Sequence, residues 1–537
     1  MESILTSGRI VQRRLKIKNM GWIDEDQALS PDEIIRSLKA FPVDLLKIYP
    51  RSFCRKNGLG YGLLRTPHGK KLAIMGERSR VLKDPFQGNC HHQLLSLKLC
   101  DLSAGNTESL MELFPYTKPV SLQKYTTTVG TGDRLGVATP GHLRAIRRFY
   151  VHPVLAQQSV MENTQTGRDF NKVIQDAAWA VFQENYQEGY GADGDHLQSL
   201  QEVKCAVNAG VSMVTLDLSK KADLEALREP KERIDRKFNE EIDEGDAKVM
   251  FHLFLDKEFV FRGSEGEFAI RFDEEGVKRN ALLFREAFDF TEEIYEWIRS
   301  QRKNEGSIDL EISMAEAPFT TSPENHFFFA LELSHRGVRI QSLAPRFICG
   351  SGRRVEDSGG REAFRRQFYL HTLIAQDYGS YKISIHSGND KFSLFSSLGE
   401  SPGRFLHLKI HETSWREAVR LIATANPTLF REMCPFARSR FEEASKLSNV
   451  TTDPGGVPTL EKRIDEELPG LLEREESRKL FDTTYGYLLD AEDEAGKKRF
   501  RDRIYDTLIQ YEEDYWSMLE THVEKHLKLF GVGKKQN

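Results

Sequence analysis

Eight short, β-prone apolar runs recur between residues 125 and 419, and each is followed by turn residues and a stretch with helical periodicity. This alternation predicts a parallel sheet, because parallel strands need crossover connections that are usually helices. The number eight favours an α/β fold with a closed (β/α)8 barrel of the TIM type over an open doubly wound sheet. The runs are 126–130, 151–156, 189–192, 212–216, 308–313, 340–343, 381–385 and 405–409.

The barrel occupies residues 121–425 in this interpretation, and other segments surround it. A charged insertion at 220–306 is too long for a simple loop and predicts a subdomain or long helices. Residues 1–120 predict an N-terminal α+β extension, in which Lys56-Asn57-Gly58 is a turn signal. Residues 426–537 predict a helical C-terminal region, whose run 500–530 predicts a helix with one packed face.

The composition excludes several classes of function. The 537 residues include 76 Lys+Arg and 81 Asp+Glu, a formal net charge of −5, so nothing favours binding to nucleic acid or to an anionic membrane. No apolar run reaches the ~20 residues of a membrane span, and no signal-peptide pattern is visible. The six cysteines form no CxxC pair, which argues against a disulfide framework or a thiolate zinc site and favours a reducing cytoplasm.

Polar or titratable side chains follow nearly every predicted strand. In a (β/α)8 barrel the C-terminal strand ends converge on one mouth, so we expect the functional site there. Each residue alone has a structural alternative, as a turn, a helix cap or an ion pair; the glycines of 130–136 are more often a tight turn than a phosphate loop. The candidates are Asp133, Arg134, Gln157, Gln158, Asp195, His196, Asp217, Glu316, Arg346, His386, Asp390, Lys391 and His407.

Three of these candidates are histidines, His196, His386 and His407, from three different predicted strands. A lone strand-end histidine is more often structural than a ligand, but imidazoles that converge on one mouth are a common divalent-metal arrangement. Asp195 and Glu316 suggest an acid–base pair, with ordinary ion pairs as the alternative. Two acids on opposite sides of a barrel mouth can address both faces of one carbon, which an epimerase requires.

Seven motifs stand in order between residues 120 and 525: GTGDRLG at 130–136, AQQS at 156–159, GYGADGDH at 189–196, TSP at 321–323, KISIHSGNDKF at 382–392, LPGLL at 468–472 and TYGY at 484–487. In this combination the chain resembles the bacterial tagaturonate epimerase family. The resemblance implies a metal-dependent enzyme that interconverts D-tagaturonate and D-fructuronate in hexuronate catabolism. On the matching motifs it implies Asp195 and Glu316 as the acid–base pair and His196 and His386 as metal ligands. The third ligand, His407, is inferred from its strand-end position alone.

The two sugar acids differ at a hydroxyl-bearing carbon one bond beyond the carbon next to the ketone. The C–H bond there is not acidified by the carbonyl, so enolisation cannot invert it. Transient oxidation needs a nicotinamide, and the chain lacks a dinucleotide fingerprint, so retro-aldol cleavage is favoured. We expect a divalent cation of the Zn, Mn, Ni or Co type as the Lewis acid. The residues expected to bind the sugar acid are Asp133, Arg134, Gln157, Gln158, Asp217, Arg346, Asp390 and Lys391.

Four alternatives stay open at this point. Another metal-dependent ketose epimerase, an aldose–ketose isomerase or a sugar aldolase would use similar residues, because the last two also pass through an enediolate. A non-catalytic sugar-binding barrel is supported only by Ala315 and Ala317 on either side of Glu316. The sequence does not indicate an oligomeric state.

Overall fold

The computed structural model describes residues 36, 38, 41–92, 96–301, 307–347, 358–386, 405–410, 413–448, 460 and 463–535. The chain divides into two compact units, Met1–Lys118 with Ala178–Gln187, and Pro119–Ala177 with Glu188–Asn537. Among the helices of these described ranges, none combines the length and the apolar character that a membrane crossing requires.

The first unit is built on a five-stranded antiparallel sheet in the order β1-β2-β3-β5-β4. Asn57 and Gly58, both with positive φ, form the two-residue hairpin between the first two strands, as the turn signal predicted. Phe53, Leu64 and Leu97 pack together in the core of the unit. The elements are β1 (Lys47–Lys56), β2 (Leu59–Thr66), β3 (Gly69–Gly76), α3 (Arg78–Lys83), β4 (Asn89–His92), β5 (Ser96–Asp101) and α4 (Ala104–Leu113).

The second unit contains a closed barrel of eight parallel strands in the order β12-β13-β14-β15-β6-β7-β8-β9. Each of the eight runs predicted from the sequence overlaps one of these strands, so the predicted (β/α)8 fold is confirmed. The strands are β6 (Thr127–Gly130), β7 (His152–Ser159), β8 (Gly191–Leu197), β9 (Met213–Asp217), β12 (Asp309–Ser313), β13 (Ser342–Ala344), β14 (Lys382–His386) and β15 (Leu406–Lys409).

Helices follow the barrel strands, and local sequence sets where they begin. At the start of the helix after β7, the Ser159 hydroxyl accepts a hydrogen bond from the Glu162 N–H, and the Glu162 carboxylate accepts one from the Ser159 N–H. These bonds satisfy two N–H groups that the helix itself leaves unpaired. Ser322 and Asn325 form the same arrangement at the helix after β12, where Pro323 occupies the first turn. These helices are α5 (Thr139–Ile146), α6 (Val160–Thr166), α7 (Phe170–Glu184), α8 (Leu200–Ala209), α12 (Pro323–His335), α13 (Ser358–Asp377) and α15 (Thr413–Ala425).

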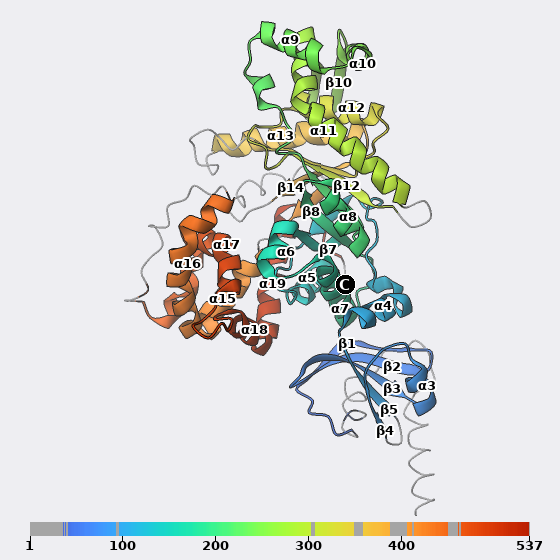
Figure 1. Cartoon of the computed structure of the whole chain (residues 1–537), viewed down its shortest axis with the longest axis vertical. Helices are drawn as coiled ribbons and strands as arrows, with labels where there is room; N and C mark the ends of the chain where they lie inside the picture. Colours follow the sequence, from blue (N-terminus) through green and yellow to red (C-terminus); the bar gives the residue numbers. More distant parts are fainter. Residues whose placement is uncertain are drawn as a thin grey trace, which may run out of the picture. The chain divides into compact units, whose positions relative to one another are not determined.

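The insertion between β9 and β12 forms helices and a two-stranded hairpin, drawn in green in Figure 1. Phe254 stacks on Phe328 of α12 with ring centroids 4.1 Å apart, and Phe261 meets Phe327 edge-on, so aromatic contacts hold the insertion against the barrel helices. Its elements are η2 (Leu224–Leu227), α9 (Lys231–Glu241), α10 (Glu244–Phe254), β10 (Glu258–Gly263), β11 (Gly266–Arg271) and α11 (Glu274–Gln301).

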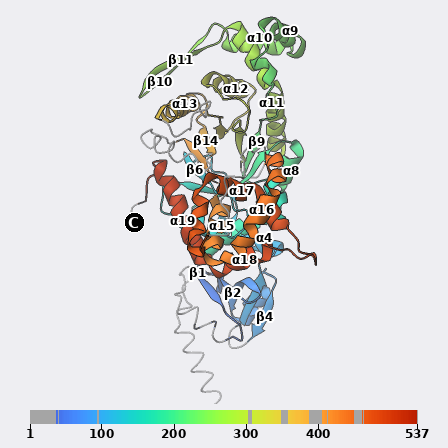
Figure 2. The ribbon, with the colours of Figure 1, turned by 90° about the vertical axis from the view of Figure 1, so that its left-hand side faces the viewer.

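The C-terminal helices, orange to red in Figures 1 and 2, pack on α5 and α6. Trp516 of the last helix donates its indole N–H to the Val137 carbonyl, and Gly141 on α5 allows the backbone at Trp516 to approach closely. The single helix predicted at 500–530 is wrong, because Tyr511 leaves the helical conformation and divides it. The elements are α16 (Pro427–Ser448), η5 (Asp465–Glu467), η6 (Pro469–Glu473), α17 (Glu475–Asp490), α18 (Arg501–Gln510) and α19 (Glu512–Leu529).

At the N-terminal ends of its strands the barrel interior combines a small apolar cluster with buried polar groups, and further polar layers lie above. Leu122, Val154 and Met213 pack together at that end, where Asp309 accepts bonds from the Ser121 hydroxyl and the Leu122 N–H. Barrels of this type are usually filled with branched apolar side chains. The polar upper layers therefore need a functional explanation.

Candidate active site

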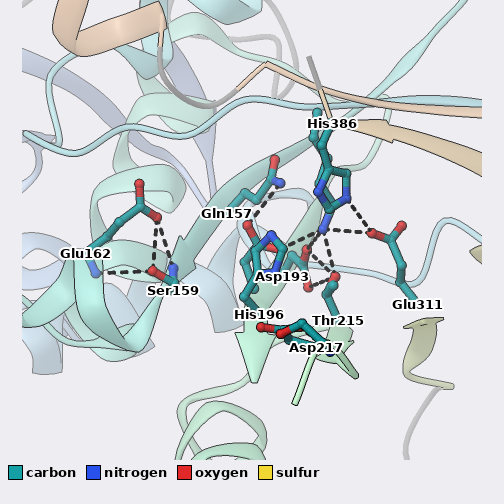
Figure 3. A network of polar contacts seen from close by, with 12 residues as sticks. Gln157, Ser159, Glu162, Asp193, His196, Thr215, Asp217, Glu311 and His386 are labelled. Atoms are coloured by element: carbon teal, nitrogen blue, oxygen red, sulfur yellow. Dashed lines mark hydrogen bonds and ion pairs between the residues drawn. The ribbon is translucent and has the colours of Figure 1, made fainter. Parts of the chain in front are cut away.

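A fully buried ammonium group lies at the centre of the polar layers. The Lys409 Nζ, from β15, is 2.7 Å from Asp195 Oδ1, 2.9 Å from Glu311 Oε1 and 3.1 Å from Asp193 Oδ2. It also donates to the Thr215 hydroxyl at 2.8 Å, and this hydroxyl donates to Asp193. Three strands, β8, β12 and β15, thus bring one cation and three carboxylates together inside the barrel, β9 adds the Thr215 hydroxyl, and Figure 3 shows the surrounding network.

The charges of this cluster stabilise one another against burial. Burial lowers the pKa of Lys409, but the three carboxylates outweigh it and raise the pKa, so the ammonium stays protonated. Burial raises the pKa of Asp193 to about 7, although Lys409 opposes the shift. The pKa of Glu311 lies well below its usual range in spite of burial, because Lys409 and His386 favour the ionised form. Glu311 is therefore a carboxylate at neutral pH.

The Glu311 carboxylate orients the His386 imidazole. His386 Nε2 lies 3.3 Å from Glu311 Oε1, and the Ser342 hydroxyl donates to the other oxygen at 2.6 Å. An ionised carboxylate only accepts hydrogen bonds, so we assign the ring proton to Nε2 and a lone pair to Nδ1. Within the described part of the chain, the buried Nδ1 atom has no hydrogen-bond partner. Burial lowers the pKa of His386 to about 4, so the ring is neutral near pH 7.

His196 lies beside this ring because β8 is irregular there. The register of β8 against β9 shifts between Gly194 and Leu197, and His196 has a left-handed φ of 52°. Such bulges redirect side chains next to active sites, and a non-glycine residue in this conformation is strained. The His196 and His386 rings lie 5.1 Å apart, nearly perpendicular, and both are labelled in Figure 3.

The two rings fit a divalent cation, because neutral imidazole nitrogens are its common ligands and the buried Nδ1 of His386 is unpaired. His407 lies deeper: it shares the inner face of β15 with Lys409, two residues earlier, and its Nδ1 is 2.8 Å from the Thr128 hydroxyl. Within the described ranges, no three His, Cys, Asp or Glu side chains are grouped to hold a metal. The role of His407 as a third metal ligand therefore stays a prediction.

Gln157 closes the other side of Asp195. Its side-chain amide donates to Asp195 Oδ2 at 3.4 Å, while its Oε1 is buried without a hydrogen-bond partner. The end of β6 must be glycine here, because a Cβ on Gly130 would lie 2.0 Å from that Oε1. The glycine that the sequence suggested for a phosphate loop thus makes room for a side chain at the site.

The residues of the first motif mostly hold the protein together. Asp133 accepts bonds from four backbone N–H groups and the Thr139 hydroxyl, and so fixes the turn into α5. Arg134 donates to Glu162 at 2.9 Å and stacks on the Tyr485 ring at 4.3 Å. Gln158 accepts a bond from Arg168 at 3.0 Å. Substrate contacts of Asp133, Arg134 and Gln158 stay predictions.

The remaining predicted residues are spread around the mouth. Asp217, at the end of β9, accepts a bond from Gln198 at 2.7 Å. Arg346 follows β13, is exposed, and donates to the Ala315 carbonyl at 3.2 Å. Glu316 is exposed in the turn after β12, whereas Asp195 is buried, so the proposed acid–base partners have different environments. Asp390 and Lys391 lie outside the described residues.

Sequence reasoning missed Glu311 and Lys409 because it considered residues that follow the predicted runs, and these two lie inside them; Asp193 directly follows the run 189–192 but was not chosen beside Asp195 and His196. The signal lay inside the strands: Glu311 alternates with Leu310 and Ile312, and Lys409 follows Leu408. In a barrel the polar members of such alternation face inward when helices cover the outer face. Counting them would have located the cluster.

Three comparisons place the chain among known proteins. A family model described as tagaturonate epimerase (UxaE) matches residues 49–530. A tagaturonate/fructuronate epimerase from Thermotoga maritima is 34% identical over 485 residues, or 90% of this chain and 96% of the relative. Crystal structures of the fructuronate-tagaturonate epimerase from Cohnella laeviribosi, native and with one glycerol bound, are 40% identical. They have TM-scores of 0.83 and 0.84 and cover 93% of this chain and 99% of theirs.

Proposed function

We propose that this chain, which belongs to the tagaturonate epimerase family and is an epimerase, interconverts D-tagaturonate and D-fructuronate with the help of a bound divalent cation. The observation that carries the metal is the state of His386: Glu311 holds its Nε2, and its buried Nδ1, beside the His196 ring, has no hydrogen-bond partner among the residues that the structure describes. His386 and His196 would hold the cation. Its identity, of the Zn, Mn, Ni or Co type, stays an expectation.

The stereochemistry of the substrates points to cleavage of a carbon–carbon bond. The inverted carbon bears a hydroxyl and lies two bonds from the ketone carbon, so the substrate is an aldol. A base removes the hydroxyl proton, the bond between that carbon and its neighbour breaks, and an aldehyde and an enediolate form. The aldehyde rotates, the bond forms again on its other face, and the alkoxide is reprotonated. When bound, a divalent cation supplies Lewis acidity for the developing negative charge.

Asp195 is the proposed base for this proton. Lys409 holds its Oδ1 at 2.7 Å, and Gln157 donates to its Oδ2 at 3.4 Å, so the carboxylate is held from two sides. Glu316 is the proposed second acid–base group, because it follows β12 and is exposed on the turn at the mouth. Arg346 is also exposed. Among the described cationic side chains we propose it first for binding the substrate carboxylate, because a guanidinium group can bind a carboxylate through two hydrogen bonds.

The metal is tested on the purified protein. We expect a stoichiometric divalent metal by elemental analysis and turnover of both sugar acids, lost on chelation and restored by adding metal. A His386→Ala variant should lose the metal, whereas the exposed His335 on α12 offers a matched control, His335→Ala, that should keep it. Full activity in metal-free protein would refute the Lewis-acid role, and retained metal in His386→Ala would refute the ligand.

The carbon–carbon cleavage is tested with substrate deuterated at the inverted carbon. In a retro-aldol route this C–D bond never breaks, so we expect full retention of deuterium and no primary isotope effect. Loss of deuterium to solvent, or a primary isotope effect, would contradict the route. The same NMR assay separates the alternatives, since an isomerase moves the carbonyl and an aldolase releases fragments.

A further inference from the structure

We infer that Lys409 is a positioning residue that holds the proposed base Asp195 and, through Glu311, the proposed metal ligand His386 in their working orientations; this inference builds on the proposed function. Nothing in the chemistry of the reaction requires a lysine at this place. Its role follows from where its ammonium group lies and from what the groups bound to it touch in turn.

One branch of contacts runs from Lys409 to the base. The ammonium donates to Asp195 Oδ1 at 2.7 Å, and both side chains are at most 1% exposed. One carboxylate oxygen is thereby fixed by the ammonium, and in the proposed mechanism the other, Oδ2, which accepts from the Gln157 amide, takes the hydroxyl proton. Without the ammonium, Asp195 would be a buried carboxylate about two residues from the end of its strand that has lost the donor at 2.7 Å, so its orientation should change.

The second branch runs to the histidine. Lys409 lies 2.9 Å from Glu311 Oε1, the same oxygen that His386 Nε2 approaches at 3.3 Å. The ammonium and the imidazole nitrogen meet at this one oxygen, so Lys409 fixes where the Glu311 carboxylate lies and, through it, how the His386 ring is oriented. Carboxylates in this position behind a metal-binding histidine typically change metal affinity 10–100-fold when they are lost. Lys409 therefore acts on the ligand atom without touching it.

Asp193 has a different part in the cluster. It contacts Lys409 at 3.1 Å and the Thr215 hydroxyl at 2.8 Å, and it serves as a counterion below the site. This permits a charge-matched test. Three carboxylates and one ammonium carry a formal charge of −2, and replacing Lys409 by Met together with Asp193 by Asn leaves two carboxylates and the same −2.

The experiment compares Lys409→Met/Asp193→Asn with the unsubstituted chain, which has the same formal charge in this cluster, and with Asp193→Asn alone, which shows what the loss of Asp193 does by itself. Metal affinity is measured by titration calorimetry with Zn²⁺ and Mn²⁺, and kcat and KM are measured on both sugar acids. Relative to both, we expect the double variant to bind metal at least tenfold more weakly and to lose about 100-fold in kcat, with KM within threefold. Equal metal affinity and equal kcat in a folded double variant would overturn the inference.

Two further variants keep the test decisive. Lys382, another buried lysine of the barrel, donates only to backbone carbonyls, those of Leu122 and Tyr125; Lys382→Met is the control for loss of a buried lysine and should change stability more than metal affinity. If the double variant does not fold, Glu311→Gln is measured instead, because it keeps Lys409 in place and keeps the side-chain volume at position 311. We expect it to weaken metal binding at least tenfold, and unchanged affinity would overturn the histidine branch.

The outcomes separate this inference from the proposed function. Absence of metal binding by the unsubstituted chain would refute the metal, and the histidine branch with it; the base branch would then be judged by kcat alone. Metal binding that is equal with and without the lysine would leave the proposed function standing and remove Lys409 from it. If Lys409 only stabilised the fold, replacing it would lower the unfolding midpoint and leave metal affinity and the balance of kcat against KM unchanged.

Discussion

The contact between Gly130 and Gln157 provides a sharp test of the site geometry. In Gly130→Ala the new Cβ would lie 2.0 Å from Gln157 Oε1 and 2.8 Å from its Cδ, whereas ordinary carbon contacts are about 3.5 Å or more. Gln157 is fully buried and must move by roughly 1 Å, which in a packed interior costs about 1–3 kcal/mol. The displaced amide also leaves Asp195, so kcat/KM should fall about 10–100-fold.

The assay is a double-mutant cycle with Gln157→Ala, followed by urea unfolding and by turnover. Alanine at 157 removes the clashing atoms, so the double variant should be more stable than the sum of the two single variants predicts, by about 1 kcal/mol or more. Gly105→Ala, on α4 with open space around the new methyl group, is the control and should cost nothing. An additive cycle, or a Gly130→Ala protein with unchanged stability and turnover, would refute the described packing.

Three further predictions concern other parts of the second unit. Arg346→Met should raise KM for both sugar acids at least tenfold and leave KM for a neutral ketohexose unchanged; equal effects on both would remove Arg346 from carboxylate binding. Ser342→Ala should lower the unfolding free energy by about 1.5–3 kcal/mol, because Glu311 Oε2 loses a buried donor at 2.6 Å; urea unfolding measures it, and no loss would contradict the bond. Burial lowers the pKa of His142 to about 4, and its ring nitrogens have no hydrogen-bond partner. Between about pH 6.5 and pH 4 the unfolded chain therefore binds a proton at this histidine more readily than the folded protein does, and the unfolding free energy falls with the pH. His142→Leu lacks this loss, so its unfolding free energy should gain about 1.4 kcal/mol per pH unit relative to the unsubstituted chain. Parallel profiles of unfolding free energy against pH would contradict this.

The parts of the fold that depend on local patterns were predictable. Runs of β-prone residues separated by helical stretches predict eight parallel strands, and this pattern does not depend on which side chains face the barrel interior. Asn57-Gly58 likewise adopts the turn that its φ preferences favour. The break at Tyr511 was missed because the amphipathic pattern continues across it. Periodicity reports which face is buried and says little about where one helix stops.

The site was predictable in its location and only partly in its members. Residues after the strands were the natural candidates, and His196, His386 and Asp195 do lie at the polar end of the barrel. Glu311 and Lys409 were missed because they lie within apolar strands. The depth of His407 in the barrel was not predictable, because the sequence does not locate the end of a four-residue strand to within the two residues that separate His407 from Lys409.

The sequence alone determined the barrel and the end of it at which polar groups gather, because the periodicities of strands and helices are local properties. Which charges meet was decided only by closure of the sheet. Lys409 and Asp195 are 214 residues apart, yet their side chains lie 2.7 Å from each other because the stagger of neighbouring strands sets which inward residues share a layer. That stagger is a property of the whole ring of strands, and no single stretch of sequence contains it.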